Sequence, residues 1–174
     1  MRAPRQTYSP AAFTLVEVLI VMVILAIAAA IVIPSIGTAA DSQAISAGRV
    51  LGSDLEVARS LALTTQQTHS LVFSPDLQSY KVVANYGGGS YASVVAVPHP
   101  VVAGERLEVC LADANGMGSV NVLAASFGGV SYVTFNSQGE PSSAGTVLLR
   151  AGGTQMTVSV SALTGAVSVT RTAG

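Results

Sequence analysis

One stretch restricts the fold more than any other: the apolar segment from Phe13 to Ile33. Its only polar side chains belong to Thr14 and Glu17. At about 1.5 Å per residue the segment spans roughly 31 Å as an α-helix, close to the thickness of a bilayer core. We therefore predict a membrane-spanning helix over residues 13–33.

The residues before this segment are basic, since they include Arg2 and Arg5 and no acid. By the positive-inside rule, this pattern predicts a single-pass chain with its N-terminus in the cytoplasm and everything after Pro34 outside.

Glu17 is the feature of this segment that needs a reason. An ionised carboxylate within a membrane segment costs on the order of a few kcal/mol, and such groups usually face a specific partner. The dipole of a helix that begins at Phe13 would offset only some tenths of a kcal/mol. Cleavage between Ala12 and Phe13 would create an α-ammonium close enough to pair with Glu17, in the same chain or in a neighbour.

The stretch FTLVEVLIVMVILAIAAAIVIP resembles the N-terminus of type IV pilins and type II secretion pseudopilins. The resemblance implies that a prepilin peptidase removes residues 1–12 and methylates Phe13. It also implies that Glu17 pairs with the terminus of a neighbouring subunit during assembly, and that Pro34 kinks the helix. The sequence departs from the family at Ala12, where glycine is usual.

Two other interpretations of the segment stay open. An ordinary secretory signal would end with SIGTAA and be cut after Ala40, although the apolar run is longer than the usual 7 to 15 residues. A plain membrane anchor would carry Glu17 incidentally.

After Pro34, residues 34–68 are predicted to continue the helix in amphipathic form. Small and apolar residues recur in steps of four and three, which places them on one face. They are Ala44, Gly48, Leu51, Leu55, Ala58 and Ala62. A polar face follows the same spacing through Arg49, Ser53, Glu56 and Ser60. Glu56 is placed to pair with Arg59 at i,i+3.

Residues 69–174 are predicted to form a β-rich external domain. Short apolar runs separated by Gly, Pro, Asn, Asp and Ser indicate strands. The runs cover residues 69–73, 80–86, 91–97, 105–111, 130–135, 146–151, 154–160 and 166–171. The predicted fold class is α+β, with a long N-terminal helix packed on one antiparallel sheet or two packed sheets.

This second half is similar to the H-type minor pseudopilins and their T-type minor pilin relatives. The similarity lies in LEVARSLALTTQQTHSLVF, SYKVV, VSYVTFNSQGEPSSAG and VSALTGAVSV. It centres on Ala58, Arg59, Phe135, Gly139 and Gly165. From the residues alone, Arg59 is interpreted as a solvated helix charge and the two glycines as turn residues.

Residues with catalytic or metal-binding chemistry are sparse. His69 is interpreted as a strand-start residue and His99 as a loop residue, and neither belongs to a protease, hydrolase or zinc motif. Cys110 cannot form an internal disulfide because the sequence has 1 cysteine, and its apolar neighbours predict a buried side chain. Asp113 to Gly116 lacks the acids of a calcium loop. We predict no enzyme, no metal and no cofactor.

We therefore predict a structural subunit of a type II secretion pseudopilus or a type IV pilus. The predicted partners are the prepilin peptidase, other pilins or pseudopilins and an inner-membrane platform protein. The chain would sit in the inner membrane with its C-terminal domain in the periplasm, and later in a fibre. A DNA-binding minor pilin is the alternative, with Arg150 and Arg171 converging, but the chain carries net charge -1 and no basic cluster, so nucleic acid is not expected.

Overall fold

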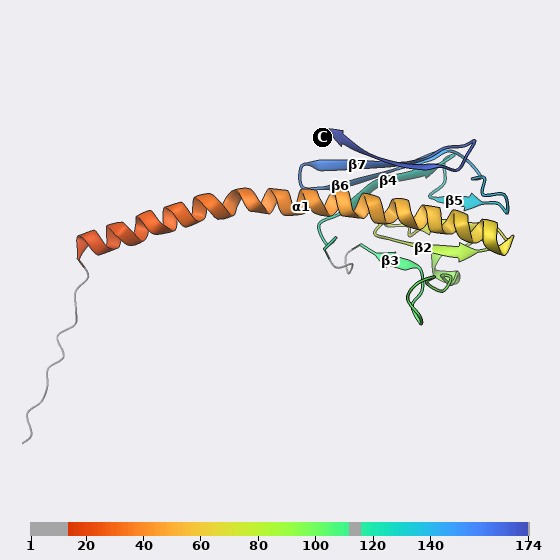
Figure 1. The fold of residues 1–174 in the computed structure, drawn as a ribbon, viewed down its shortest axis with the longest axis horizontal. Coiled ribbons are helices and arrows are strands. Elements are labelled where there is room, and N and C mark those ends of the chain that lie inside the picture. Colours follow the sequence, from red (N-terminus) through yellow and green to blue (C-terminus); the bar gives the residue numbers. More distant parts are fainter. Residues whose placement is uncertain (1–13, 112–115, 174) are drawn as a thin grey trace, which may run out of the picture. The chain divides into compact units, whose positions relative to one another are not determined.

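A computed structural model describes residues 14–111 and 116–173, without the side chains of residues 29–38 and 173. The chain divides into two compact units, Met1–Ile36 and Gly37–Gly174. One long helix, α1 (Leu15–Thr65), contributes to both (Figure 1). Its backbone is helical through Pro34, whose side chain lies outside the described residues, so the kink at Pro34 stays a prediction.

Both ends of α1 are capped by side chains. Thr14 precedes the helix, and its Oγ1 accepts the N–H of Glu17 at 3.2 Å, as the N-cap of a capping box does. At the other end, Gln66 adopts φ 56, a left-handed conformation that stops the helix. The Gln66 side-chain amide donates to the carbonyl of Leu63 at 2.7 Å and satisfies one of the last free carbonyls.

The predicted apolar stripe on α1 is confirmed. All six of its residues are buried, while the predicted polar face from Arg49 to Ser60 is exposed. The small residues serve close packing: a Cβ on Gly52 would lie 2.8 Å from Cγ2 of Val169. The last strand of the domain therefore approaches the helix backbone directly.

In the part of the chain that the structure describes, eight strands form two antiparallel sheets that pack on the Gly37–Thr65 part of α1. The first sheet has the order β3-β2-β1-β5 and the second β4-β6-β7-β8. The strands of the first are β1 (His69–Phe73), β2 (Ser79–Ala84), β3 (Glu108–Cys110) and β5 (Tyr132–Phe135). Those of the second are β4 (Asn121–Phe127), β6 (Gly145–Ala151), β7 (Thr154–Val160) and β8 (Val167–Ala173). Figure 1 shows the second sheet on one side of this part of α1 and β2 and β3 on the other.

Among the described residues, a hydrophobic core lies between the two sheets and the helix. Leu51 and Leu55 of α1 meet Leu71 and Phe135 of the first sheet and Val147 of the second in this core. The two sheets adjoin where β4 comes close to β5. The predicted α+β architecture with a helix on antiparallel sheets is therefore confirmed.

Two strand predictions differ from the structure. Residues 91–97 do not form a strand. They form a 3₁₀ turn, η1 (Tyr91–Ser93), followed by irregular chain. Pro98 has no N–H to donate, and of this stretch only Val97 forms a backbone hydrogen bond with β2. Strand β4 is absent from the prediction, since a bulge between Val122 and Ala124 breaks its alternation of buried and exposed side chains.

Candidate functional site: the N-terminal turns of the helix and the Arg59 clasp

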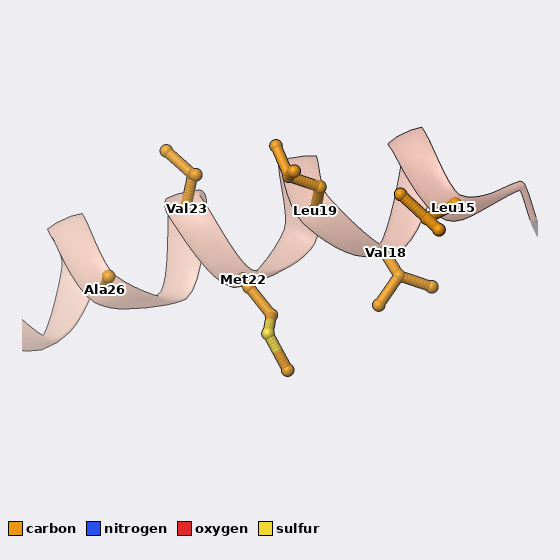
Figure 2. Close-up of a pocket in the computed structure, with 6 residues that line it drawn as sticks. All are labelled: Leu15, Val18, Leu19, Met22, Val23 and Ala26. Carbon is orange, nitrogen blue, oxygen red and sulfur yellow. The ribbon is translucent and has the colours of Figure 1, made fainter.

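The first turns of α1 carry exposed apolar side chains. Every residue from Thr14 to Ala28 is exposed, with Leu15 at 82%. Figure 2 shows one side of this stretch, where Leu19 and Val23 point one way and Val18 and Met22 the other. A helix that is apolar all round is normally enclosed by other apolar groups.

Glu17 is the acid on this otherwise apolar surface. It shares a stripe with Val21 and Leu25 at steps of four, so an apolar partner laid along that stripe would meet the carboxylate. No ion pair involves Glu17 among the residues that the structure describes. The backbone N–H of Glu17 donates to Thr14 Oγ1, and this bond does not use the Glu17 carboxylate.

The other predicted processing residues fall outside this description. Ala12 and Phe13, the expected cleavage and methylation positions, lie outside the described residues. Within residues 14–111 and 116–173, no helix is both long and apolar enough to cross a membrane.

A polar clasp joins the C-terminal part of α1 to the β5–β6 loop and to the start of β8. The Nε of Arg59 donates to the carbonyl of Gly139 at 3.1 Å, and its Nη1 lies 3.6 Å from Oε2 of Glu56. The other Glu56 oxygen accepts the N–H of Val167 at 3.2 Å. The predicted Glu56–Arg59 pair is confirmed, but Arg59 is more than a solvated charge, since it ties the helix to the β5–β6 loop while Glu56 ties it to the start of β8.

Gly139 and Gly165 are packing positions as well as turn residues. Their φ angles are +76 and +65, in the left-handed region that favours glycine. A Cβ on Gly165 would lie 2.6 Å from the Gly139 oxygen and 3.1 Å from Arg59 Nε. Three of the residues that carried the family resemblance therefore meet at one place.

A second polar contact between helix and sheet involves Asp54 and Tyr80. The Tyr80 hydroxyl donates to Asp54 Oδ2 at 2.7 Å. Burial raises the pKa of Asp54 above its usual 3.8, although the Tyr80 hydrogen bond and the nearby His99 act against this. Burial and the adjacent Asp54 carboxylate raise the pKa of Tyr80 well above 10.0.

The remaining sequence candidates do not converge on a reactive site. His69 begins β1 and is buried, and His99 lies in a loop, as predicted. Cys110 is exposed rather than buried, because β3 is an edge strand whose alternate residues face solvent. Of the Asp113–Gly116 segment only Gly116 is described, and the described residues contain no group of three or more potential metal ligands.

Arg150 and Arg171 do not converge. Arg171 on β8 pairs with Met156, which pairs with Leu149, so Arg171 shares the inner face of the second sheet with those side chains. Arg150 follows Leu149 and therefore projects from the opposite face. The basic stripe that the DNA-binding alternative requires is not formed by these two residues.

A helix with bare apolar first turns, carrying two antiparallel sheets on its second half, defines a pilin-like protein. Residues 40–165 match the family model described as type II transport protein GspH, and residues 9–33 match the prokaryotic N-terminal methylation motif. The first match covers well over half of the chain, and the chain belongs to the GspH family.

Solved structures agree with this fold. The chain is 12% identical to the minor pseudopilin EpsH from the type 2 secretion system of Vibrio cholerae, with a TM-score of 0.54 over 75% of this chain and 97% of that one. It is 16% identical to the type IV minor pilin FimU of Pseudomonas aeruginosa, with a TM-score of 0.51 over 72% of this chain and 90% of that one. At these identities the likeness establishes the fold alone. The comparison with curated proteins gives no match.

Proposed function

We propose that the chain is a structural fibre subunit that a prepilin peptidase cuts between Ala12 and Phe13 and methylates on Phe13. The subunit then assembles with other pilins or pseudopilins through its N-terminal helix. The observation that carries the proposal is the wholly exposed apolar surface from Thr14 to Ala28 with Glu17 as its charge. The match of residues 9–33 to the methylation motif supports the processing step.

Before assembly, the subunit is held in the inner membrane by residues 13–33, with its N-terminus in the cytoplasm and the Gly37–Gly174 unit in the periplasm. A platform protein in the membrane is the partner that receives it. Helix α1 continues through Ala40, so a secretory signal cut after this residue would fall inside the helix, next to the buried stripe. This argues against a secretory signal.

Glu17 acts in this proposal as the register element of the fibre. Its carboxylate meets the Phe13 ammonium of a neighbouring subunit in apolar surroundings, where an opposite charge is strongly attractive. Removal of one member of a buried pair costs about 3–5 kcal/mol, because the other charge is left uncompensated. Subunits displaced along the axis would lose this pair, so the contact favours one axial position.

The test compares Glu17→Ala with Val21→Ala, a neutral change one turn further along the same stripe. Glu17→Ala should still insert and be cut before Phe13, but it should be lost from the sedimentable fibre fraction. Val21→Ala should be incorporated like the wild type. The mass of the mature chain reports cleavage and methylation, and normal incorporation of Glu17→Ala would refute the role given to this carboxylate.

A further inference from the structure

A hairpin between η1 and β3 is anchored to the first sheet by backbone hydrogen bonds. The N–H of Leu107 donates to the carbonyl of Val97 at 2.8 Å, and the N–H of His99 donates to the opposite leg at 2.8 Å. Val82 of β2 bonds to both legs, at 2.8 Å to Val97 and 2.9 Å to Leu107. We call residues 97–107 the 97–107 hairpin, which Figure 1 draws in green near β3.

The tip of this hairpin is held by the imidazole of His99. Its Nδ1 accepts the N–H of Val101 at 3.2 Å and the N–H of Val102 at 3.0 Å. A backbone N–H only donates, so Nδ1 carries no proton in this conformation and the neutral ring has its proton on Nε2. The tip therefore requires the uncharged form of His99, because both nitrogens of a charged imidazole are donors.

Two other turns in the described chain use acceptors that do not titrate near neutral pH. Oδ1 of Asn136 accepts the N–H of Gln138 at 2.9 Å, and Oδ1 of Asp76 accepts the N–H of Gln78 at 3.1 Å. As with His99, a δ1 atom accepts an N–H two residues further on, which is the arrangement of an Asx-turn. His99 differs from both, because histidine changes its charge between about pH 5 and 8.

The second histidine of the chain has the opposite arrangement. Nδ1 of His69 lies 3.2 Å from the carbonyl oxygen of Gln67, so this nitrogen has to be the donor. A proton added to the His69 ring leaves that bond in place, since Nδ1 is already protonated. Loss of an acceptor on protonation is therefore expected for His99 and not for His69.

The His99 ring borders a cavity of about 220 Å³ whose charged groups have both signs. The groups that share this cavity are Asp54 of α1, Glu105 and Arg106 of the hairpin and Glu108 of β3. Behind them lie Tyr80 of β2, bonded to Asp54, and Lys81 of β2, which pairs opposite Glu108 and lies 4.0 Å over the Tyr91 ring. These charges adjust the pH at which the ring titrates. What protonation does to the tip follows from the two N–H groups alone.

We propose that the 97–107 hairpin is a pH-sensitive switch in which protonation of His99 releases the tip. When Nδ1 takes up a proton, the N–H groups of Val101 and Val102 lose their acceptor, and the cavity gives the ring room to turn away from them. The bonds at the base do not use the imidazole, so they stay. Val101, which is 85% exposed, is thus held in a fixed place at neutral pH and freed in acid. This inference goes beyond the proposed function and needs no fibre.

The test measures amide hydrogen exchange of the full chain in detergent micelles by NMR. Each rate is divided by that of an unstructured peptide of the same sequence at the same pH, which removes the intrinsic pH dependence of exchange. Protection of Val101 and Val102 should fall roughly tenfold from about pH 8 to pH 5, as the loss of a neutral hydrogen bond predicts. The amides of Leu107 and Gln138 should keep their protection, since neither is bonded to a histidine side chain.

His99→Asn is the matched control, because the Asn Oδ1 can accept the same two N–H groups and does not titrate. This variant should keep the tip protected at both ends of the pH range. His99→Ala should leave the tip unprotected at both ends, with Leu107 still protected. Glu105→Gln should keep the switch and move its midpoint to lower pH by roughly half a unit, because a nearby negative charge that favours the imidazolium is gone.

Four results would overturn the proposal. The first is wild-type protection of Val101 and Val102 that does not change with pH. The second is an equal loss of protection in His99→Asn and the wild type. The third is a parallel loss at Leu107, which would mean that the whole hairpin opens. The fourth is a midpoint that moves to higher pH in Glu105→Gln, since the titrating group would then not be the ring beside this carboxylate.

Discussion

Replacement of Gly165 by alanine should disrupt the clasp around Arg59 and destabilise the domain. The new Cβ would lie 2.6 Å from the carbonyl oxygen of Gly139, which accepts the Arg59 hydrogen bond, so this oxygen has to move. An alanine at φ +65 costs roughly 1–2 kcal/mol for the left-handed backbone. Loss of a partly exposed charged hydrogen bond adds about 1–2 kcal/mol. The free energy of unfolding should fall by about 2–4 kcal/mol in total.

Gly129→Ala is the matched control for the backbone term. Gly129 has φ +93, and a Cβ there would meet nothing within 4 Å. The free energy of unfolding of this variant should therefore fall only by the cost of the left-handed backbone, about 1–2 kcal/mol. The assay is urea unfolding of the Gly37–Gly174 unit followed by circular dichroism, because the core cluster begins at Ala44 and the unit contains all of it.

The two variants decide whether the clasp contributes to stability. If Gly165→Ala and Gly129→Ala lower the free energy of unfolding by the same amount, the contact with Gly139 and Arg59 contributes nothing to stability and the reasoning fails. A double-mutant cycle sharpens the result, since Gly165→Ala should cost less in an Arg59→Met background, where the hydrogen bond is already absent.

Three more predictions concern other parts of the same unit. Asp54→Asn should be more stable than the wild type at neutral pH, and the difference in stability should shrink as pH falls toward 4. Burial raises the pKa of Asp54, so ionisation of this carboxyl weakens the native state as pH rises. An Asn side-chain oxygen can still accept the Tyr80 hydroxyl. Urea unfolding of both proteins at several pH values checks this. Gly52→Ala should cost about 1–2 kcal/mol through its contact with Val169, and Val169→Ala in the same chain should recover part of the loss, as thermal unfolding would show. Cys110 should react with a maleimide in the folded protein as fast as in urea, since the thiol is exposed, and protection in the folded state would contradict this.

Sequence patterns predicted the parts of the fold that depend on the regular spacing of apolar residues along a helix or a strand. The buried stripe from Ala44 to Ala62 follows the helical repeat because one face of α1 meets both sheets along its length. The β1–β2 hairpin follows from apolar strands around a turn that contains Pro75 and Asp76. The N-terminal motif could be recognised because Glu17 stands out in an apolar run.

The parts that were missed depend on tertiary context. Cys110 has apolar neighbours in sequence, yet an edge strand paired on one side leaves it open. The role of Arg59 could not be predicted, because Gly139 and Gly165 approach it only after β5, β7 and β8 have formed. The hairpin formed by residues 97–107 was not predicted: its two ends fall at the edges of the predicted strands 91–97 and 105–111, and the pairing of Leu107 with Val97 arises only in the folded chain.

The attachment of α1 within the Gly37–Gly174 unit has a mechanical consequence. Asp41 Oδ1 accepts the N–H of Gly153 at 3.1 Å near the point where the helix enters, and Arg59 holds the far end. Tension along the helix axis therefore loads these bonds and the stripe between them together, in shear. Contacts that must fail together withstand more force than a bond that opens alone, so both bonds and the whole stripe share the load.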